Sequence, residues 1–284
     1  MKDIGIPLVV GPGSQPADAD GAEMDFMQMP SGMTTFTAPM IPEPEAVEGL
    51  DDALAISHEI QKILETYQVD NAAKSVDISH LDDKNRGFFD QLLGEGEVSV
   101  QCNGDINALI QESVLAGVWR VQFQDQNQQT IRDTIEVAAV PSLVSELTFQ
   151  GAAESIDPAK FEIPPDVYNA PPLLTEIADK MPGYQPGDEP HVINLSLLPH
   201  TEEDLMFLSD CLGIGPIIIL SRGYGNCRIS STGTKNVWWV QYFNSQETLI
   251  LNTLEISEVP EVACAAQEDI DDSANRLAEI LSIY

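Results

Sequence analysis

The stretch LLGEGEVSVQCNGDINALI at residues 92–110 recurs, with substitutions, as CLGIGPIIILSRGYGNCRI at residues 211–229. The same offset of 119 aligns GVWRVQF (117–123) with NVWWVQY (236–242), and DTIEVAAVP (133–141) with NTLEISEVP (252–260). Over residues 93–141 and 212–260, 15 of 49 aligned positions are identical, whereas composition alone gives roughly three. The chain therefore contains a duplicated module, and its function is best sought where the two copies differ.

Each copy has the residue pattern of one helix followed by four strands. The helices are expected at 83–93 and 202–212, and Thr201 with Asp204 has the spacing of a capping box. The expected strands are 97–102, 106–113, 117–124 and 130–138 in the first copy, and 216–221, 227–232, 236–243 and 248–256 in the second. The sequence thus predicts an α+β fold: two tandem copies of a four-stranded antiparallel meander packed by helices.

Two proline-rich segments divide the chain. Residues 1–47 contain GPGSQP, APMIPEPE and six of the eight methionines, which predicts an extended N-terminal arm. Its methionines either pack on the protein's own domains or offer an adaptable contact to a partner. The segment 151–172 is expected to be a linker between a first repeat at 48–150 and a second repeat at 173–284. The first repeat opens with a helix at about 48–66, and a long helix closes the second.

The charge of the chain excludes several classes of partner. Among 284 residues, 46 are acidic and 13 basic, which gives a net charge of −33. Nucleic acids and anionic membranes require basic surfaces, so neither is expected to bind. The apolar runs are too short to cross a bilayer, no signal peptide is expected, and four irregularly spaced cysteines suit a reducing cytoplasm. The acidity either keeps the surface solvated or steers a basic protein partner.

The copies differ most clearly at residues 221–228. The first copy has an ordinary hairpin connection here, whereas the second places a tyrosine and a thiol between two arginines. Arginine forks bind carboxylates, phosphates or backbone carbonyls, so the segment is either a recognition site, a turn whose arginines neutralise local acids, or a catalytic site. The predicted partner-binding residues are Arg222, Gly223, Tyr224, Gly225, Asn226, Cys227, Arg228, Trp238 and Trp239.

Catalytic and metal motifs are weak in this sequence. The pair Gly213 and Gly215 follows a helix and opens a strand, the reverse of the order in a dinucleotide fingerprint. There is no C-x-x-C, so a metal site would need Cys227 to meet Cys211, His200 or Cys264 in space. Two arginines would lower the pKa of a thiol only if the side chains point together, which strand alternation opposes. No catalytic residue and no cofactor are predicted.

The strings LSLLPHTEEDL (195–205), GPIIILSRGYGNCRISST (215–232), VWWVQYFNS (237–245) and TLILNTLEISEVPEVACAA (248–266) resemble the HupH/HyaF family of accessory proteins for uptake nickel–iron hydrogenases. The N-terminal GPGSQP and APMIPEPE also fit that family. The resemblance implies a cytoplasmic, non-catalytic assembly factor that helps to mature the iron–sulfur small subunit. Thioredoxin-like and rubredoxin-like accessory proteins are possible further partners. The family offers no established catalytic residues to carry over.

Three hypotheses follow from the residues and the resemblance together. The first is a chaperone-like protein that binds the precursor of the hydrogenase small subunit through Arg222, Tyr224 and Arg228. The second is a carrier or sensor of iron or of an iron–sulfur cluster that uses Cys227. The third is an enzyme with Cys227 as nucleophile. A duplicated, acidic module without a convincing active site favours the first.

Overall fold

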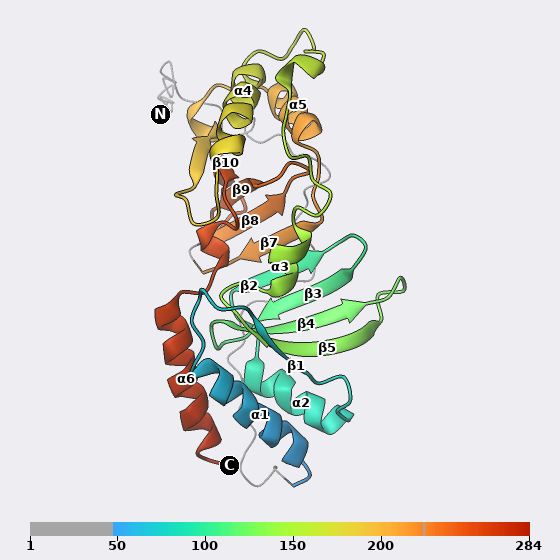
Figure 1. Cartoon of the computed structure of the whole chain (residues 1–284), viewed down its shortest axis with the longest axis vertical. Coiled ribbons are helices and arrows are strands. Elements are labelled where there is room, and N and C mark those ends of the chain that lie inside the picture. The colour runs from blue at the N-terminus through green and yellow to red at the C-terminus, as the bar shows by residue number, and fades with distance from the viewer. Residues whose placement is uncertain (1–47, 224) are drawn as a thin grey trace, which may run out of the picture. The chain divides into compact units, whose positions relative to one another are not determined.

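The computed structural model describes residues 48–223 and 225–284, so the predicted arm at 1–47 and Tyr224 lie outside the described residues. The described residues form an α+β fold around one antiparallel sheet (Figure 1). Its strands are β1 (Lys74–Asp77), β2 (Val98–Cys102), β3 (Asn107–Glu112), β4 (Val118–Gln124), β5 (Thr130–Val137), β6 (His191–Asn194), β7 (Ile217–Ser221), β8 (Asn226–Ser231), β9 (Val237–Phe243) and β10 (Leu249–Ile256). The strand order is β1-β5-β4-β3-β2-β7-β8-β9-β10-β6, so both repeats share one sheet.

The two halves of the sheet meet at β2 and β7 through a pseudo-twofold arrangement. These strands pair antiparallel with Val100 opposite Ile219, and the two residues differ by the repeat offset of 119. Equivalent backbone bonds flank the pair: Arg222 N donates to Glu97 O at 3.0 Å, and Asn103 N donates to Pro216 O at 2.8 Å. The duplicated modules therefore associate edge to edge, as two copies of one chain do in an isologous dimer.

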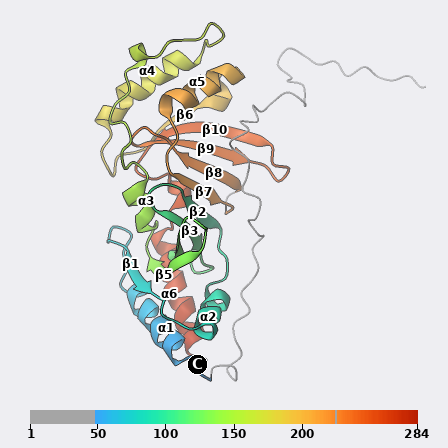
Figure 2. The same cartoon turned by 90° about the vertical axis from the view of Figure 1, so that its right-hand side faces the viewer.

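Six α-helices and four short 3-10 helices accompany the sheet in the described residues. The α-helices are α1 (Asp51–Leu64), α2 (Asp83–Leu93), α3 (Ser142–Leu147), α4 (Ala170–Lys180), α5 (Glu202–Leu212) and α6 (Gln267–Leu281). The 3-10 helices are η2 (Pro158–Lys160), η3 (Met181–Gly183), η4 (Leu195–Leu197) and η5 (Glu261–Ala263). Helices α4 and α5 pack together in the second repeat (Figure 2). No helix in this part of the chain combines the length and apolarity that a membrane span requires.

The C-terminal helix packs across the repeat boundary. Helix α6 lies beside α1 (Figure 1), and both belong to one apolar cluster with α2. Ile270, Leu277 and Leu281 of α6 are buried in that cluster beside Ile60 and Leu64 of α1. The last helix of the chain thus completes the core of the first repeat.

A second apolar cluster runs through the junction of the repeats. It contains Val100 and Ile219 of the central strand pair together with Trp119 and Trp238, which are equivalent by the offset of 119. Trp119 Nε1 donates to Ala138 O at 2.8 Å, and Trp238 Nε1 donates to Glu258 O at 3.2 Å. Buried indole N–H groups are therefore satisfied in both repeats, and one core spans the seam.

Helix starts are fixed by equivalent polar side chains. Thr201 and Asp204 form the predicted capping box at α5. Asp204 Oδ1 also accepts bonds from Tyr168 N, Asn169 N and Ala170 N at the start of α4, at 2.8, 2.8 and 3.1 Å. Its equivalent in the first repeat, Asn85, accepts from Ala53 N at 3.0 Å. One side-chain position thus joins two helices in each repeat.

The structure adds elements that the sequence patterns did not predict. Each half has a fifth strand, β1 or β6, at the outer edge of the sheet. Helix α4 begins at Ala170, inside the segment predicted as a linker, with prolines at its first positions, where a missing N–H costs no helical bond. The predicted strands of both repeats agree with β2–β5 and β7–β10 within one residue at each end.

Candidate functional site

The connection between β7 and β8 lies at the junction of the two repeats. Its backbone is held by the bond from Arg222 N to Glu97 O, a residue of the first repeat. Gly223 packs so closely that an added Cβ would lie 2.0 Å from Glu97 Oε2. Gly225 has a φ of 104°, a conformation that side chains other than glycine rarely adopt. The two glycines therefore let this hairpin turn tightly against the first repeat.

An acidic cavity of about 740 Å³ opens beside this hairpin. Gly223 and Ser221 form one wall, and the first repeat, the segment 262–265 and α6 form the others. The charged side chains that line it are Glu97, Glu112, Asp269, Asp272 and Arg276. Four carboxyl groups against one guanidinium group suit a basic group of a ligand or partner.

Glu112 is the most unusual group in the cavity. Its side chain is buried, and Gly117 N donates to its Oε1 at 3.5 Å. Burial raises the pKa of this carboxyl to about 7, and repulsion from Glu97 and Asp269 adds to the rise. Near neutral pH the group therefore changes between a hydrogen-bond donor and a charged acceptor. The equivalent residue of the second repeat is Ser231, which is buried and hydrogen-bonded to Ile217.

The predicted site residues divide into an exposed part and a buried part. Gly223 and Gly225 are exposed, and Arg222 and Asn226 are half-buried. The buried part contains Cys227, Arg228, Trp238 and Trp239. Trp239 Nε1 donates to Asn252 Oδ1 at 2.6 Å, so this ring is fixed within the sheet. Cys227 and Arg228 follow the hairpin in β8, whereas Trp238 and Trp239 pair with Ser231 and Ser230 at the other end of that strand, so the structure does not bring the two tryptophans to the hairpin. Among the described residues, the accessible surface of the hairpin consists of Arg222, Gly223, Gly225 and Asn226.

The thiols lie in environments that oppose ionisation. Burial raises the pKa of Cys227 to about 12, although a hydrogen bond with Tyr242 acts in the opposite direction. Burial likewise raises the pKa of Cys211 to about 11. His200 Nδ1 lies 3.1 Å from Leu195 O and is therefore the protonated ring nitrogen. Across residues 48–223 and 225–284, no group of three or more His, Cys, Asp or Glu side chains is placed to hold a metal ion.

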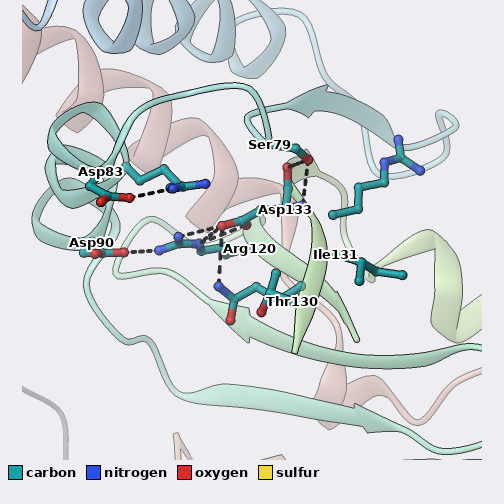
Figure 3. Close-up of a pocket in the computed structure, with 10 residues that line it drawn as sticks. Ser79, Asp83, Asp90, Arg120, Thr130, Ile131 and Asp133 are labelled. Carbon is teal, nitrogen blue, oxygen red and sulfur yellow. Dashed lines mark hydrogen bonds and ion pairs between the residues drawn. The ribbon is translucent and has the colours of Figure 1, made fainter. Parts of the chain in front are cut away.

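A second polar pocket, of about 390 Å³, lies in the first repeat (Figure 3). Arg120 occupies its floor, with Nε and Nη2 bonded to Asp133 at 3.1 and 2.7 Å and a further ion pair to Asp90. Burial opposes the charge on Arg120, but the bonds to Asp133 and Asp90 raise its pKa above the usual value. Asp133 N in turn donates to Ser79 Oγ at 2.9 Å. The arginine is thus fully engaged in holding α2 to the sheet.

Sequence reasoning found the hairpin but missed the cavity beside it. Glu97 and Glu112 differ from their equivalents Pro216 and Ser231, so the comparison of the two copies contained the signal for both. The contribution of α6 to the cavity could not be found by comparing the two copies. Asp269 and Asp272 reach the cavity because the last helix packs on the first repeat, which no local pattern indicates.

One protein-family model matches the chain twice. It describes the C-terminal conserved region of the HupH hydrogenase expression protein, and it matches residues 50–157 and 167–284. The two matches agree with the internal duplication. A solved structure of the hydrogenase expression protein HupH from Thiobacillus denitrificans is 32% identical and covers 40% of this chain and 93% of its own, with a TM-score of 0.34.

Curated relatives match over nearly the whole chain. The hydrogenase expression/formation protein HoxQ of Cupriavidus necator is 44% identical, over 99% of this chain and 98% of that protein. HupH of Rhodobacter capsulatus, which carries the same description, is also 44% identical, over 97% and 96%. The hydrogenase-1 operon protein HyaF of Escherichia coli is 33% identical, over 96% and 94%. The first two relatives are named for the expression and formation of hydrogenase, and HyaF for the hydrogenase-1 operon.

Proposed function

The chain belongs to the HupH family of hydrogenase expression proteins, and from that premise we propose that it is a chaperone-like accessory protein that binds the precursor of the iron–sulfur small subunit. In this proposal it acts in the cytoplasm, without a cofactor and without catalysing a reaction. Thioredoxin-like and rubredoxin-like accessory proteins are its further proposed partners. The precursor is its client, and maturation of the hydrogenase is its purpose.

The observation that carries this proposal is the hairpin at the junction of the repeats. Residues 221–226 carry an arginine and a tyrosine that have no counterpart in the first copy, and Arg222, Gly223 and Gly225 are accessible there. A client that contacts this hairpin also reaches the acidic cavity next to it. We therefore assign the client-binding site to the exposed hairpin residues, which Cys227 and Arg228 continue into β8, and leave Trp238 and Trp239 out of the site.

Charge supports a protein client over a small anion at this site. The chain carries 46 acidic and 13 basic residues, and four of the acidic ones line the cavity beside the hairpin. An acidic protein attracts a basic client surface over long range and repels anions. Arg222, which is half-buried beside the exposed glycines, then contacts the client at close range. The acidic side chains thus attract the client over long range, and Arg222 helps to orient it at the site.

The test is tagged co-purification from cells that express the hydrogenase operon. Wild type should retain the small-subunit precursor, and Arg222→Glu should retain at least about tenfold less, since a donor fork is replaced by a like charge near Glu97. Arg228 is not altered, because a glutamate at this buried position would disturb the fold. The eluates are quantified by mass spectrometry, which also detects thioredoxin-like and rubredoxin-like proteins.

A matched control separates the site from the net charge. Lys160→Glu makes the same change of charge at an exposed position of η2, and it should retain the precursor as wild type does. Circular dichroism confirms that each variant is folded. The proposal fails if the precursor is absent from the wild-type eluate. The site assignment alone fails if Arg222→Glu retains the precursor at the wild-type level.

A further inference from the structure

The pocket of Figure 3 has an apolar counterpart in the second repeat. Helices α2 and α5 and strands β5 and β10 are related by the offset of 119, so the residues around the two positions can be compared one by one. Four of the nine charged or polar residues that line the pocket have apolar equivalents: Arg86, Arg120, Thr130 and Arg132 correspond to Leu205, Trp239, Leu249 and Leu251. Others keep their polarity, as Asp83 and Gln122 correspond to Glu202 and Gln241. Three of the chain's 13 basic residues thus have apolar equivalents in the second repeat.

Hydrogen bonds show that the two places have the same geometry. In the first repeat Asp133 N donates to Ser79 Oγ at 2.9 Å, and in the second Asn252 N donates to Ser196 Oγ at 2.8 Å. Asp133 binds Arg120, and Asn252 binds Trp239, the residues at the equivalent positions. The backbone framework is therefore retained while the side-chain chemistry has changed from ionic to apolar.

The apolar counterpart is accessible to solvent. Leu197 is 79% exposed, Ile250 is 60% exposed and Met206 is 50% exposed, all unusually high for large apolar side chains. Leu205 and Leu249 are half-buried on the same elements as Met206 and Ile250. We define the second-repeat face as these five residues, contributed by η4, α5 and β10.

Acidic side chains border the second-repeat face. Glu202, Glu203 and Asp210 are exposed on α5. Glu203 and Asp210 stand three and four residues from Met206, so they share its side of the helix. An apolar centre with an acidic border is complementary to apolar side chains flanked by lysine or arginine. A second copy of this chain fits poorly, because it carries the same acidic border and a net charge of −33.

We propose that the second-repeat face is a docking surface for a partner segment whose apolar side chains are flanked by basic ones. The apolar side chains bury Leu197, Met206 and Ile250, and the basic ones pair with Glu202, Glu203 and Asp210. The surface is separate from the hairpin at 221–226, so the inference goes beyond the function proposed above and does not require the same partner.

The test uses the full chain and fluorescent model peptides. The first peptide alternates leucine with lysine, the second replaces each lysine by glutamate, and the third replaces each leucine by serine. Fluorescence anisotropy should show binding of the first peptide, at least about tenfold weaker binding of the other two, and weakening of the first by added salt. Equal binding of the lysine and glutamate peptides would overturn the proposal.

The internal repeat provides a matched pair of variants. Ile250→Asp should weaken binding of the leucine–lysine peptide at least about tenfold, while Ile131→Asp, at the equivalent and similarly exposed position of the first repeat, should leave it unchanged. Arg222→Glu should also leave it unchanged, so failure of the hairpin site is distinguished from failure of this one. Equal effects of the two aspartate variants would contradict the proposal. So would sedimentation showing that wild type occupies the face with a second copy.

Discussion

At the scale of single residues, the carboxyl group of Glu112 has the clearest consequence for stability. Burial raises its pKa from 4.5 to about 7, so the folded state holds a proton that the unfolded state releases near pH 4.5. The stability from this group is complete below that pH and is lost as the pH rises through about 7. The free energy of unfolding should therefore fall by about 2 kcal/mol between pH 5 and pH 8 on account of Glu112.

Glu112→Gln removes this dependence, because an amide does not titrate in that range. Urea unfolding at pH 5 and pH 8 gives the free energy of unfolding of variant and wild type. Relative to wild type, the variant should be more stable at pH 8 than it is at pH 5. Glu279→Gln, at an exposed position of α6, serves as control and should follow wild type at both pH values. A difference between Glu112→Gln and wild type that does not change with pH would contradict the raised pKa.

At the scale of elements, the sequence predicts the parts that carry a strong periodic pattern. Strands β2–β5 and β7–β10 alternate or are apolar throughout, and α2 and α5 have clear starts. The edge strands KSVD (74–77) and HVIN (191–194) are only four residues long and contain one and two apolar residues, which is too few to form such a pattern. Pro171 and Pro172 indicate a loop, although prolines are also accepted in the first turn of a helix. Local sequence patterns also do not indicate against which apolar cluster a helix packs.

The candidate site, like the helices and strands, could be predicted only in part from the sequence. A comparison of the two copies selects residues 221–228 without any structure, because a basic segment is conspicuous in an acidic chain. It does not separate exposed from buried members, since the alternation that buries Cys227 depends on how β8 pairs with β7 and β9. Nor does it find Asp269 and Asp272, which lie on a helix that packs on the other repeat.

The packing of α6 on the first repeat gives a prediction at this scale. Leu277 is buried against the first-repeat cluster, so Leu277→Ala should lower the free energy of unfolding by about 2–5 kcal/mol. Hydrogen exchange should then increase most in α1, although α1 precedes α6 by some 200 residues. Leu174→Ala, an equally buried change in α4, should instead increase exchange most in α5, which α4 contacts. The reverse pattern would place α6 on the second repeat.

At the scale of the whole molecule, the pairing of β2 with β7 makes the two repeats one folding unit. Val100 and Ile219 face each other across the seam, and the cluster around them includes tryptophans from both halves. Helix α6 makes a second connection between the repeats. It follows the second repeat in the sequence, but its apolar side chains pack in the core of the first. Neither half can therefore unfold without exposing apolar surface of the other, which favours a single cooperative transition.

The seam residue Ile219 tests this cooperativity. Ile219→Ala removes buried methyl groups where the halves meet and should lower the free energy of unfolding by about 2–5 kcal/mol. Tryptophan fluorescence and far-ultraviolet circular dichroism should still give one coincident thermal transition, at a lower Tm, because both halves lose the same support. Leu109→Ala, at a partly exposed position of β3, should change Tm little. Two separated thermal transitions in wild type would show that the repeats unfold as independent domains. A loss of stability confined to one repeat in Ile219→Ala would show the same.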